Sequence, residues 1–500
     1  MSLPPDIIFI VLDTQRADRL GSYGYAKAHT PNFDQFARQS AQFEQAIAPA
    51  QWTIPSHASM FTGLYPTAHQ VTQSNQALSA DQPQLAEWLR RAGYETVGFC
   101  NNPLVGVLDN GFKRGFEQFY NYCGASPNSY KRFEKMPSLI QKGLRTLAQG
   151  FRRFADPIQN LFGQSELAFR MSLNAWMTPI WSRLINFKGQ NERSARHVVR
   201  FLQDWETEQK DKPLFLFLNL METHLPFWPP QQYIDQCAPY LREDKAAQAE
   251  MRRWNREAYR WAAPLAEPLA ELEGRVLSDL YDAEVAYQDA YLGRLLAYLA
   301  TRQNKRNTLT IIVADHGDGL GEHDMVGHAF NAYQELVHVP LIVNWPGVVS
   351  AETHINTPVS TRRVFHTMLE AAGIDWREEG DSAHLSLLAT INADDPENGT
   401  AFAEIFPPQN FIAALEQRQP ALIARFHCNT LRRAIVQQRW KYVAVAAATD
   451  ELYDLHADPL ELRELLGDNG ARVVNSAEAL TLQLTAFIQT VENQRDGLIA

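Results

Sequence analysis

The stretch "DIIFIVLD", residues 6–13, is a continuous apolar run that ends in a carboxylate. A β-strand that is covered on both faces has this pattern, because neither face needs polar side chains. Two further runs have the same form, "KPLFLFLNL" at residues 212–220 and "TLTIIVAD" at residues 308–315. We therefore expect these three segments to be buried strands of one sheet.

Helical patterns alternate with the strands along the chain. Apolar residues recur at helical spacing in residues 29–43, 82–93 and 280–302, and "YETVGFC" and "VPLIVNWPG" supply two more strand candidates. This alternation predicts an α/β fold, a doubly wound and mostly parallel sheet flanked by helices. In such a fold ligands bind at the carboxyl ends of the strands.

The pattern of predicted strands changes after about residue 395. Shorter strand patterns, "RRAIVQQ" and "WKYVAVAA", replace the long apolar runs there. We expect a catalytic domain over residues 1–395 and a small C-terminal α+β subdomain over residues 396–500. Two mostly helical stretches, 125–205 and 238–275, are predicted to be insertions in the first domain.

Composition narrows the class of protein. A net charge of -11 argues against a general nucleic-acid binder, which needs a basic surface. No apolar run approaches the roughly 18 residues of a membrane span. The first residues contain no signal peptide pattern, and the four cysteines show no metal spacing, so we expect reduced thiols and a cytoplasmic protein. The cysteines are Cys100, Cys123, Cys237 and Cys428.

Residues 131–188 are unusually basic, with ten Lys and Arg against three Asp and Glu. Aromatic residues such as Phe151 and Trp176 are interleaved with these charges. The plain interpretation is a helical cap that packs on the domain or on another subunit of a homo-oligomer. The alternative is a surface for peripheral membrane or lipid contact.

Polar side chains follow three of the predicted strands. Asp13 ends the first run, Asp315 and His316 end another, and Glu222 and His224 follow the third. A carboxylate at the end of a buried strand is costly unless it binds a cation or hydrogen-bond donors. The placement suits a divalent cation held by Asp13, Asp315 and His316, with Thr53 Oγ as a further ligand. A solvated acidic turn in "ADHGDGLGEHD" is the alternative.

Segments along most of the chain resemble one family, in family order. They include "DIIFIVLDTQRADRLGSYGY", "TIPSHASMFTGLYPTAHQV", "YDAEVAYQDAYLG", "IIVADHGDGLGEHDMVGH" and "ELYDLHADPLE", and they run from residue 6 to about residue 465. The chain resembles the sulfatase-like branch of the alkaline phosphatase superfamily. This resemblance implies a metal-dependent hydrolase of sulfate, phosphate or phosphonate esters, which are small anionic substrates.

The resemblance also implies roles for single residues. Asp13 matches the first metal carboxylate, and Thr14 stands where many members have a second Asp. Asp315 and His316 match the metal pair of the C-terminal motif. Oxygen-rich ligands favour Mn or Mg as the divalent metal ion, with Ca and Zn as the other choices.

Further matches concern the reacting groups. Arg16 resembles the arginine that braces the site near the nucleophile, and His224 resembles the histidine at the transferring group or its leaving oxygen. His328 stands where sulfatases carry a lysine, so it could hold the anion when protonated, act as an acid, or join Glu222 and His323 in a second metal site. His57 replaces the arginine of the C-x-P-x-R signature, either as a helix residue or in contact with the nucleophile.

Thr53 occupies the position of the cysteine or serine that sulfatases oxidise to formylglycine. Threonine would give a ketone, so the aldehyde mechanism is closed. Metal-activated threonine at a helix N-terminus can accept a phosphoryl group instead. We therefore expect hydrolysis of phosphate diesters or phosphonate monoesters. The alternatives are a sulfatase without formylglycine, a phosphoryl-group transferase, and a catalytically dead binding protein.

Overall fold

The three apolar runs form adjacent parallel strands at the centre of the fold. In the computed structural model, β1 lies between β6 and β8, with Ile8 opposite Leu216 on one side and Thr310 on the other. Every residue of β1 is buried. The structure describes residues 3–124, 127–131, 173–174, 176–178, 182, 186–208, 211–302, 306–374, 385–467 and 470–499.

The main sheet has eight strands in the order β13-β2-β12-β8-β1-β6-β4-β5. All neighbouring pairs are parallel except those of β12, which runs antiparallel to both β8 and β2. The predicted mostly parallel sheet is therefore confirmed. Its strands are β1 (Asp6–Leu12), β2 (Ala41–Phe43), β4 (Glu95–Cys100), β5 (Gln118–Asn121), β6 (Leu214–Leu220), β8 (Thr308–Val313), β12 (Leu341–Asn344) and β13 (Thr353–Ile355).

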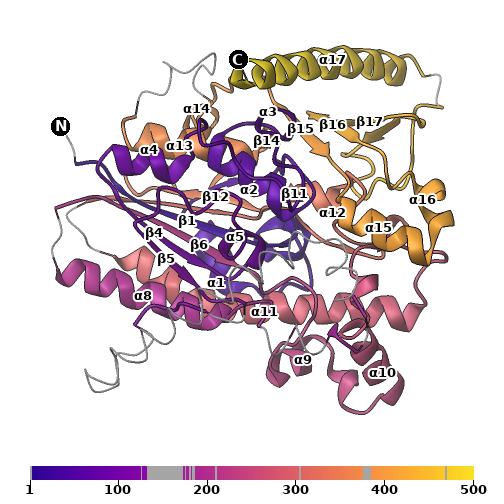
Figure 1. Cartoon of the computed structure of the whole chain (residues 1–500), viewed down its shortest axis with the longest axis horizontal. Helices are drawn as coiled ribbons and strands as arrows, with labels where there is room; N and C mark the ends of the chain where they lie inside the picture. Colours follow the sequence, from indigo (N-terminus) through magenta and orange to yellow (C-terminus); the bar gives the residue numbers. More distant parts are fainter. Residues whose placement is uncertain are drawn as a thin grey trace.

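Helices cover both faces of this sheet. Figure 1 shows α2, α4 and α13 on one side and α1, α8 and α11 on the other. This double cover explains why the central strands are mostly apolar on both faces. The helices are α1 (Pro31–Ala37), α2 (Thr53–Thr62), α4 (Leu85–Arg91), α8 (Asn191–Thr207), α11 (Glu271–Thr301) and α13 (Val364–Ala371).

Two predicted helices have different bounds. The helix expected at 29–43 ends at Ala37, because Ala41–Phe43 pairs with β12 and β13 as strand β2. The helix expected at 280–302 begins earlier, at Glu271. Its first turns are part of the main layer as well, since Val276 and Leu277 are buried in the main hydrophobic core.

The predicted insertions need one correction. Helix α8, which was assigned to the insertion at 125–205, belongs to the helical layer of the main sheet, since Val198 and Leu202 lie in the main hydrophobic core. Residues 238–275 contain helix α10 (Lys245–Trp254), and they also contain a short strand, β7 (Ala263–Pro264). β7 pairs with β10 (Met325–Gly327), so this insertion is tied to the loop after β8.

The C-terminal part has the predicted α+β character. A four-stranded antiparallel sheet is covered by the long helix α17 (Ala471–Ile499), where Phe402 stacks on Phe487 at a ring distance of 3.9 Å. The boundary at residue 395 stays a prediction. The strands are β15 (Thr400–Ile405), β16 (Arg432–Gln437), β17 (Trp440–Val445) and β18 (Glu451–Asp454).

Other predictions concern the surface and the cysteines. Most of the basic segment 131–188 lies outside the described residues, so its cap or membrane role stays a prediction. None of the helices within the described ranges is both long and apolar enough to cross a bilayer. All four cysteines are free thiols, as predicted.

Candidate active site

Three buried side chains from two strands meet at the carboxyl edge of the sheet. Asp13 directly follows β1, and Asp315 and His316 follow β8, the neighbouring strand. Their ligand atoms lie within 4.8 Å of one another, and all three residues are fully buried. The structure thus brings together the predicted metal ligands from positions about 300 residues apart in the chain.

The two carboxylates lack a compensating positive charge of their own. Burial and the charge of Asp315 raise the pKa of Asp13 well above its usual range. Burial also works against ionisation of Asp315, but the neighbouring imidazoles of His316 and His57 outweigh it and hold the pKa of Asp315 at about 2. Asp13 Oδ1 and Asp315 Oδ2 are buried without a hydrogen-bond partner among the described residues. Two such oxygens beside an imidazole fit a divalent cation.

Thr53 is the first residue of α2, and it lies at this cluster. Thr53 Oγ1 is 3.3 Å from His316 Nε2. His316 Nδ1 lies 2.8 Å from the carbonyl oxygen of Gly317, so Nδ1 carries the proton and the Nε2 lone pair faces Thr53 and the carboxylates. The neighbouring Ser56 points elsewhere, since its hydroxyl donates to the carbonyl of Asp315 at 2.6 Å.

His57 lies behind the cluster, one helical turn after Thr53. Its Nδ1 is 3.0 Å from the Thr53 carbonyl oxygen and 3.3 Å from Asp315 Oδ2. The ring is fully buried among Phe61, Phe112 and Phe217. His57 therefore orients Asp315 and the first turn of α2, and it does not face a substrate.

Asn102 is a site residue that the sequence did not suggest. Its Nδ2 donates to Asp13 Oδ2 and lies 3.5 Å from Thr53 Oγ1. Its Oδ1 accepts from the Leu104 amide at 2.7 Å, which fixes the amino group toward the cluster. The available signal was its position in "CNNP", where a strand of the same sheet ends.

Three imidazoles lie together beside Thr53. The ring of His328 is 4.4 Å from that of His316 and 5.1 Å from that of His224. Burial lowers the pKa of His328 to about 4, and burial with the charge of His328 lowers that of His224 to about 3. Both rings are therefore neutral near pH 7, which argues against His328 as a permanently charged anion holder. Asp318 Oδ1, 2.8 Å from His328 Nδ1, orients this ring.

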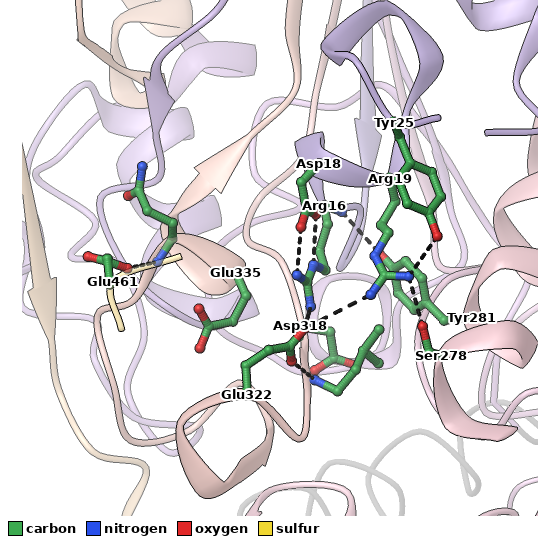
Figure 2. Close-up of polar contacts among 12 residues, drawn as sticks. Arg16, Asp18, Arg19, Tyr25, Ser278, Tyr281, Asp318, Glu322, Glu335 and Glu461 are labelled. Carbon is green, nitrogen blue, oxygen red and sulfur yellow. Dashed lines mark hydrogen bonds and ion pairs between the residues drawn. The ribbon is translucent and has the colours of Figure 1, made fainter. Parts of the chain in front are cut away.

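Arg16 reaches the site indirectly. Figure 2 shows its guanidinium group between Asp18 and Glu322. The same group donates to the carbonyl oxygen of Asp318 at 3.0 Å. Arg16 thus braces the residue that orients His328, and its role near the nucleophile, which the resemblance implies, stays a prediction.

The second metal site expected from Glu222, His323 and His328 is not formed. Glu222 lies 3.7 Å from the Lys188 ammonium, in a separate buried cluster with Glu284. His323 Nδ1 is 3.0 Å from Glu335, and its ring stacks on Tyr333. Each side chain has a partner of its own, so the three do not converge. Asp13, Asp315 and His316 are the only such ligand group within the described residues.

Thr14 does not replace the missing family carboxylate. Its hydroxyl donates to the Asp13 carbonyl at 2.7 Å and lies 3.2 Å from Thr223 Oγ1. Its backbone amide instead points at Asp315 Oδ1, at 3.3 Å. The residue has a φ of 60°, a left-handed conformation that is unusual for a β-branched side chain.

The fold and this site define an ester hydrolase of the alkaline phosphatase superfamily. The family model named Sulfatase matches residues 5–374, and the chain therefore belongs to the sulfatase family. It is 24% identical to the uncharacterized sulfatase YidJ of Escherichia coli, over 93% of this chain and 83% of that protein. It is 25% identical to the multifunctional alkaline phosphatase superfamily protein PehA of Trinickia caryophylli, over 98% of both.

A solved structure shares the fold over nearly the whole chain. The phosphonate monoester hydrolase of Agrobacterium radiobacter superposes with a TM-score of 0.64 and 20% identity, covering 98% of this chain and 96% of that one. The predicted family and fold class are thus confirmed.

Proposed function

We propose that this protein hydrolyses phosphate diesters or phosphonate monoesters, with Thr53 as the nucleophile. The observation that carries the proposal is the position of Thr53 Oγ1, 3.3 Å from Nε2 of His316, which belongs to the ligand group formed with Asp13 and Asp315. A hydroxyl in that position acts as a nucleophile when a cation lies next to it.

The reaction takes two displacements at phosphorus. Thr53 Oγ, after losing its proton to water, forms a bond to phosphorus while the bond to the leaving oxygen breaks. Water then attacks phosphorus, the bond to Thr53 Oγ breaks, and the hydroxyl of Thr53 is restored. A divalent cation bound by Asp13, Asp315 and His316 would lower the pKa of the Thr53 hydroxyl and neutralise the anion.

The remaining groups bind and orient. The amino group of Asn102 faces Thr53 Oγ1 and can donate to the oxyanion of the transferring group. His224 and His328 are neighbours. The Nδ1 atom of His224 contacts the carbonyl oxygen of Leu225, and the Nδ1 atom of His328 contacts Asp318 Oδ1. Their Nε2 atoms are thus left for the substrate or its leaving oxygen.

Threonine favours phosphorus over sulfur for a chemical reason. A phosphorylated threonine is released by water at phosphorus, whereas a sulfated threonine lacks the exit route that an aldehyde hydrate provides. The printed name of the Agrobacterium enzyme, a phosphonate monoester hydrolase, supports phosphonate esters. The printed names of other relatives, among them a choline-sulfatase of Rhizobium meliloti, support the second candidate, a sulfatase that works without formylglycine.

Matched aryl esters test the proposal. Purified protein with Mn²⁺ or Mg²⁺ is assayed with 4-nitrophenyl sulfate, bis(4-nitrophenyl) phosphate and 4-nitrophenyl phenylphosphonate, and its intact mass is measured. We expect an unmodified Thr53 and faster turnover of both phosphorus esters. Clearly faster sulfate turnover with Thr53 unmodified would contradict the proposal. Transfer to an added alcohol in preference to water would indicate the phosphoryl-group transferase.

A further inference from the structure

The turn after β1 is held in a strained conformation. Thr14 has a φ of 60°, which brings the Cβ of an L residue close to its own backbone and is least tolerated with a β-branched side chain. Such a conformation persists only when the surroundings hold it. The turn matters because it presents Asp13 on one side and Arg16 on the other.

One hydroxyl group holds both flanks of this strained residue. The Tyr281 hydroxyl donates to the carbonyl oxygen of Thr14 at 2.7 Å and accepts the backbone amide of Arg16 at 2.9 Å. Tyr281 is fully buried and comes from the middle of α11. Figure 2 shows it beside Arg16 and Arg19.

The held conformation aims the turn at the carboxylate cluster. With φ positive, the Thr14 amide points at Asp315 Oδ1, and the Asp13 carboxylate lies against Asp315. If residue 14 relaxed to a negative φ, the peptide that joins it to Asp13 would rotate. The amide would then leave Asp315, and Asp13 would move away from a neighbour that repels it.

We propose that Tyr281 is a positioning residue, which keeps Thr14 in the left-handed conformation and so holds Asp13 and Asp315 together to receive a divalent cation. The proposal concerns the metal cluster and is independent of the substrate class. A sulfatase or a phosphonate hydrolase would need it equally.

Metal titration of a small set of variants tests this role. Chelated protein is titrated calorimetrically with Mn²⁺, Mg²⁺, Ca²⁺ and Zn²⁺ in turn, and unfolding is followed without metal. Loss of an orienting contact behind a metal site costs roughly 10- to 100-fold in affinity, so we expect about a tenfold loss in Tyr281→Phe. Tyr287→Phe is the matched control, since it removes a hydroxyl of the same helix that contacts Glu192, and it should bind metal normally.

A double variant separates positioning from general support. Thr14→Gly removes the strain, because glycine adopts positive φ without penalty. We expect Tyr281→Phe to cost little, less than about threefold, in the Thr14→Gly background, since nothing then has to be held. An equal loss in both backgrounds, an unchanged affinity in Tyr281→Phe, or wild-type protein that binds none of the four metals would overturn the proposal.

A second variant, on the other side of the turn, keeps the proposal testable if Tyr281→Phe fails to fold. If Tyr281→Phe does not unfold cooperatively, Thr223→Val removes both the contact with Thr14 Oγ1 and the hydrogen bond to the Asp13 carbonyl oxygen, while keeping the shape of the side chain. The same rescue by Thr14→Gly is then expected. Its absence would count against strain at residue 14 as the link to metal affinity.

Discussion

Two buried pairs of carboxylates lie near the carboxyl ends of the central strands, and they differ in one respect. Glu222 and Glu284 enclose the Lys188 ammonium, which is 2.8 Å from Glu284 and 3.7 Å from Glu222. Among the described residues, neither Asp13 nor Asp315 forms an ion pair with a lysine or arginine, and the groups that face Asp315 Oδ2 are the imidazoles of His57 and His316.

The difference separates a structural cluster from a ligand site. A buried carboxylate costs several kcal/mol unless a cation compensates it, roughly as for any ion moved into the interior. The Glu222 and Glu284 pair has its cation within the chain, so it is complete after folding. The Asp13 and Asp315 pair is complete only when a cation comes from outside. The lack of a lysine or arginine partner within the described part of the chain therefore indicates function at Asp13 and Asp315, and the presence of Lys188 indicates stability at Glu222 and Glu284.

Substitution of the nucleophile should have the largest effect. Thr53→Ala removes the attacking oxygen and should reduce kcat on the order of 10⁴-fold or more, as in other enzymes that lose a nucleophile. Thr53→Ser should keep appreciable activity, and Ser56→Ala, whose hydroxyl is committed to the Asp315 carbonyl, is the matched control. Steady-state kinetics on an aryl phosphodiester measures all three. Activity in Thr53→Ala within tenfold of wild type would show that another group attacks.

The second prediction breaks the metal pair directly. Asp315→Asn should abolish activity, on the order of 10³-fold or more, because the cluster loses a charged ligand. Without metal the variant should be as stable as the wild type or more stable, since the repulsion with Asp13 is gone. With Mn²⁺ at 100 times Kd the wild type should gain about 2.7 kcal/mol, and the variant should gain almost nothing. Thermal unfolding with and without metal gives both numbers, and an equal metal shift in the two proteins would refute the assignment.

The third prediction breaks the other pair. Lys188→Met keeps much of the side-chain volume but removes the internal cation, so the free energy of unfolding should fall by about 3–5 kcal/mol. The affinity for Mn²⁺ should change little, because Lys188 has no contact with the metal cluster. Chemical denaturation and calorimetry measure these quantities. A stability equal to wild type would mean that the Glu222 and Glu284 cluster does not depend on Lys188.

The smallest expected effect is a pH dependence. Burial, followed by the charge of Glu222, raises the pKa of Glu284 from its ordinary value of 4.5 to about 8, although Lys188 opposes this shift. A carboxyl group with a raised folded pKa stabilises the fold most below pH 4.5, and this contribution is lost as pH rises toward 8. Glu284→Gln cannot ionise, so its stability relative to wild type should increase with pH by up to about 1.4 kcal/mol per unit. A pH-independent difference would contradict the shift.

The sequence predicted the parts of the site that end buried strands. Asp13, Asp315 and His316 could be found because each follows an apolar run, and parallel strands place their carboxyl ends on one edge. Asn102 was not predicted as a site residue because its sequence context is that of an ordinary helix cap. Its contact with Asp13 and Thr53 depends on which atoms surround its amino group in the fold. Glu222 also follows a strand, but the distant Lys188 and Glu284 decide its environment.

The limits of the fold prediction have a similar cause. The apolar composition of the central strands is enough to predict that they are buried, so the sequence predicts β1, β6 and β8 with nearly correct ends. Strand β2 is three residues long and forms only because β12 and β13 lie beside it. The role of α8 in the main layer depends on its packing with α11, which no local pattern encodes.

Helix α2 has a consequence for the motion of the active site. All ten of its residues are buried, and it ends in Gly63 with a φ of 73°. Helix termini normally fray, and frayed segments open without the rest of the protein. Thr53 stands at such a terminus, but it is buried with the rest of α2, so we expect the amides of α2 to exchange with solvent only when the whole domain opens. Thr53, the proposed nucleophile, should then keep its place for as long as the domain stays folded.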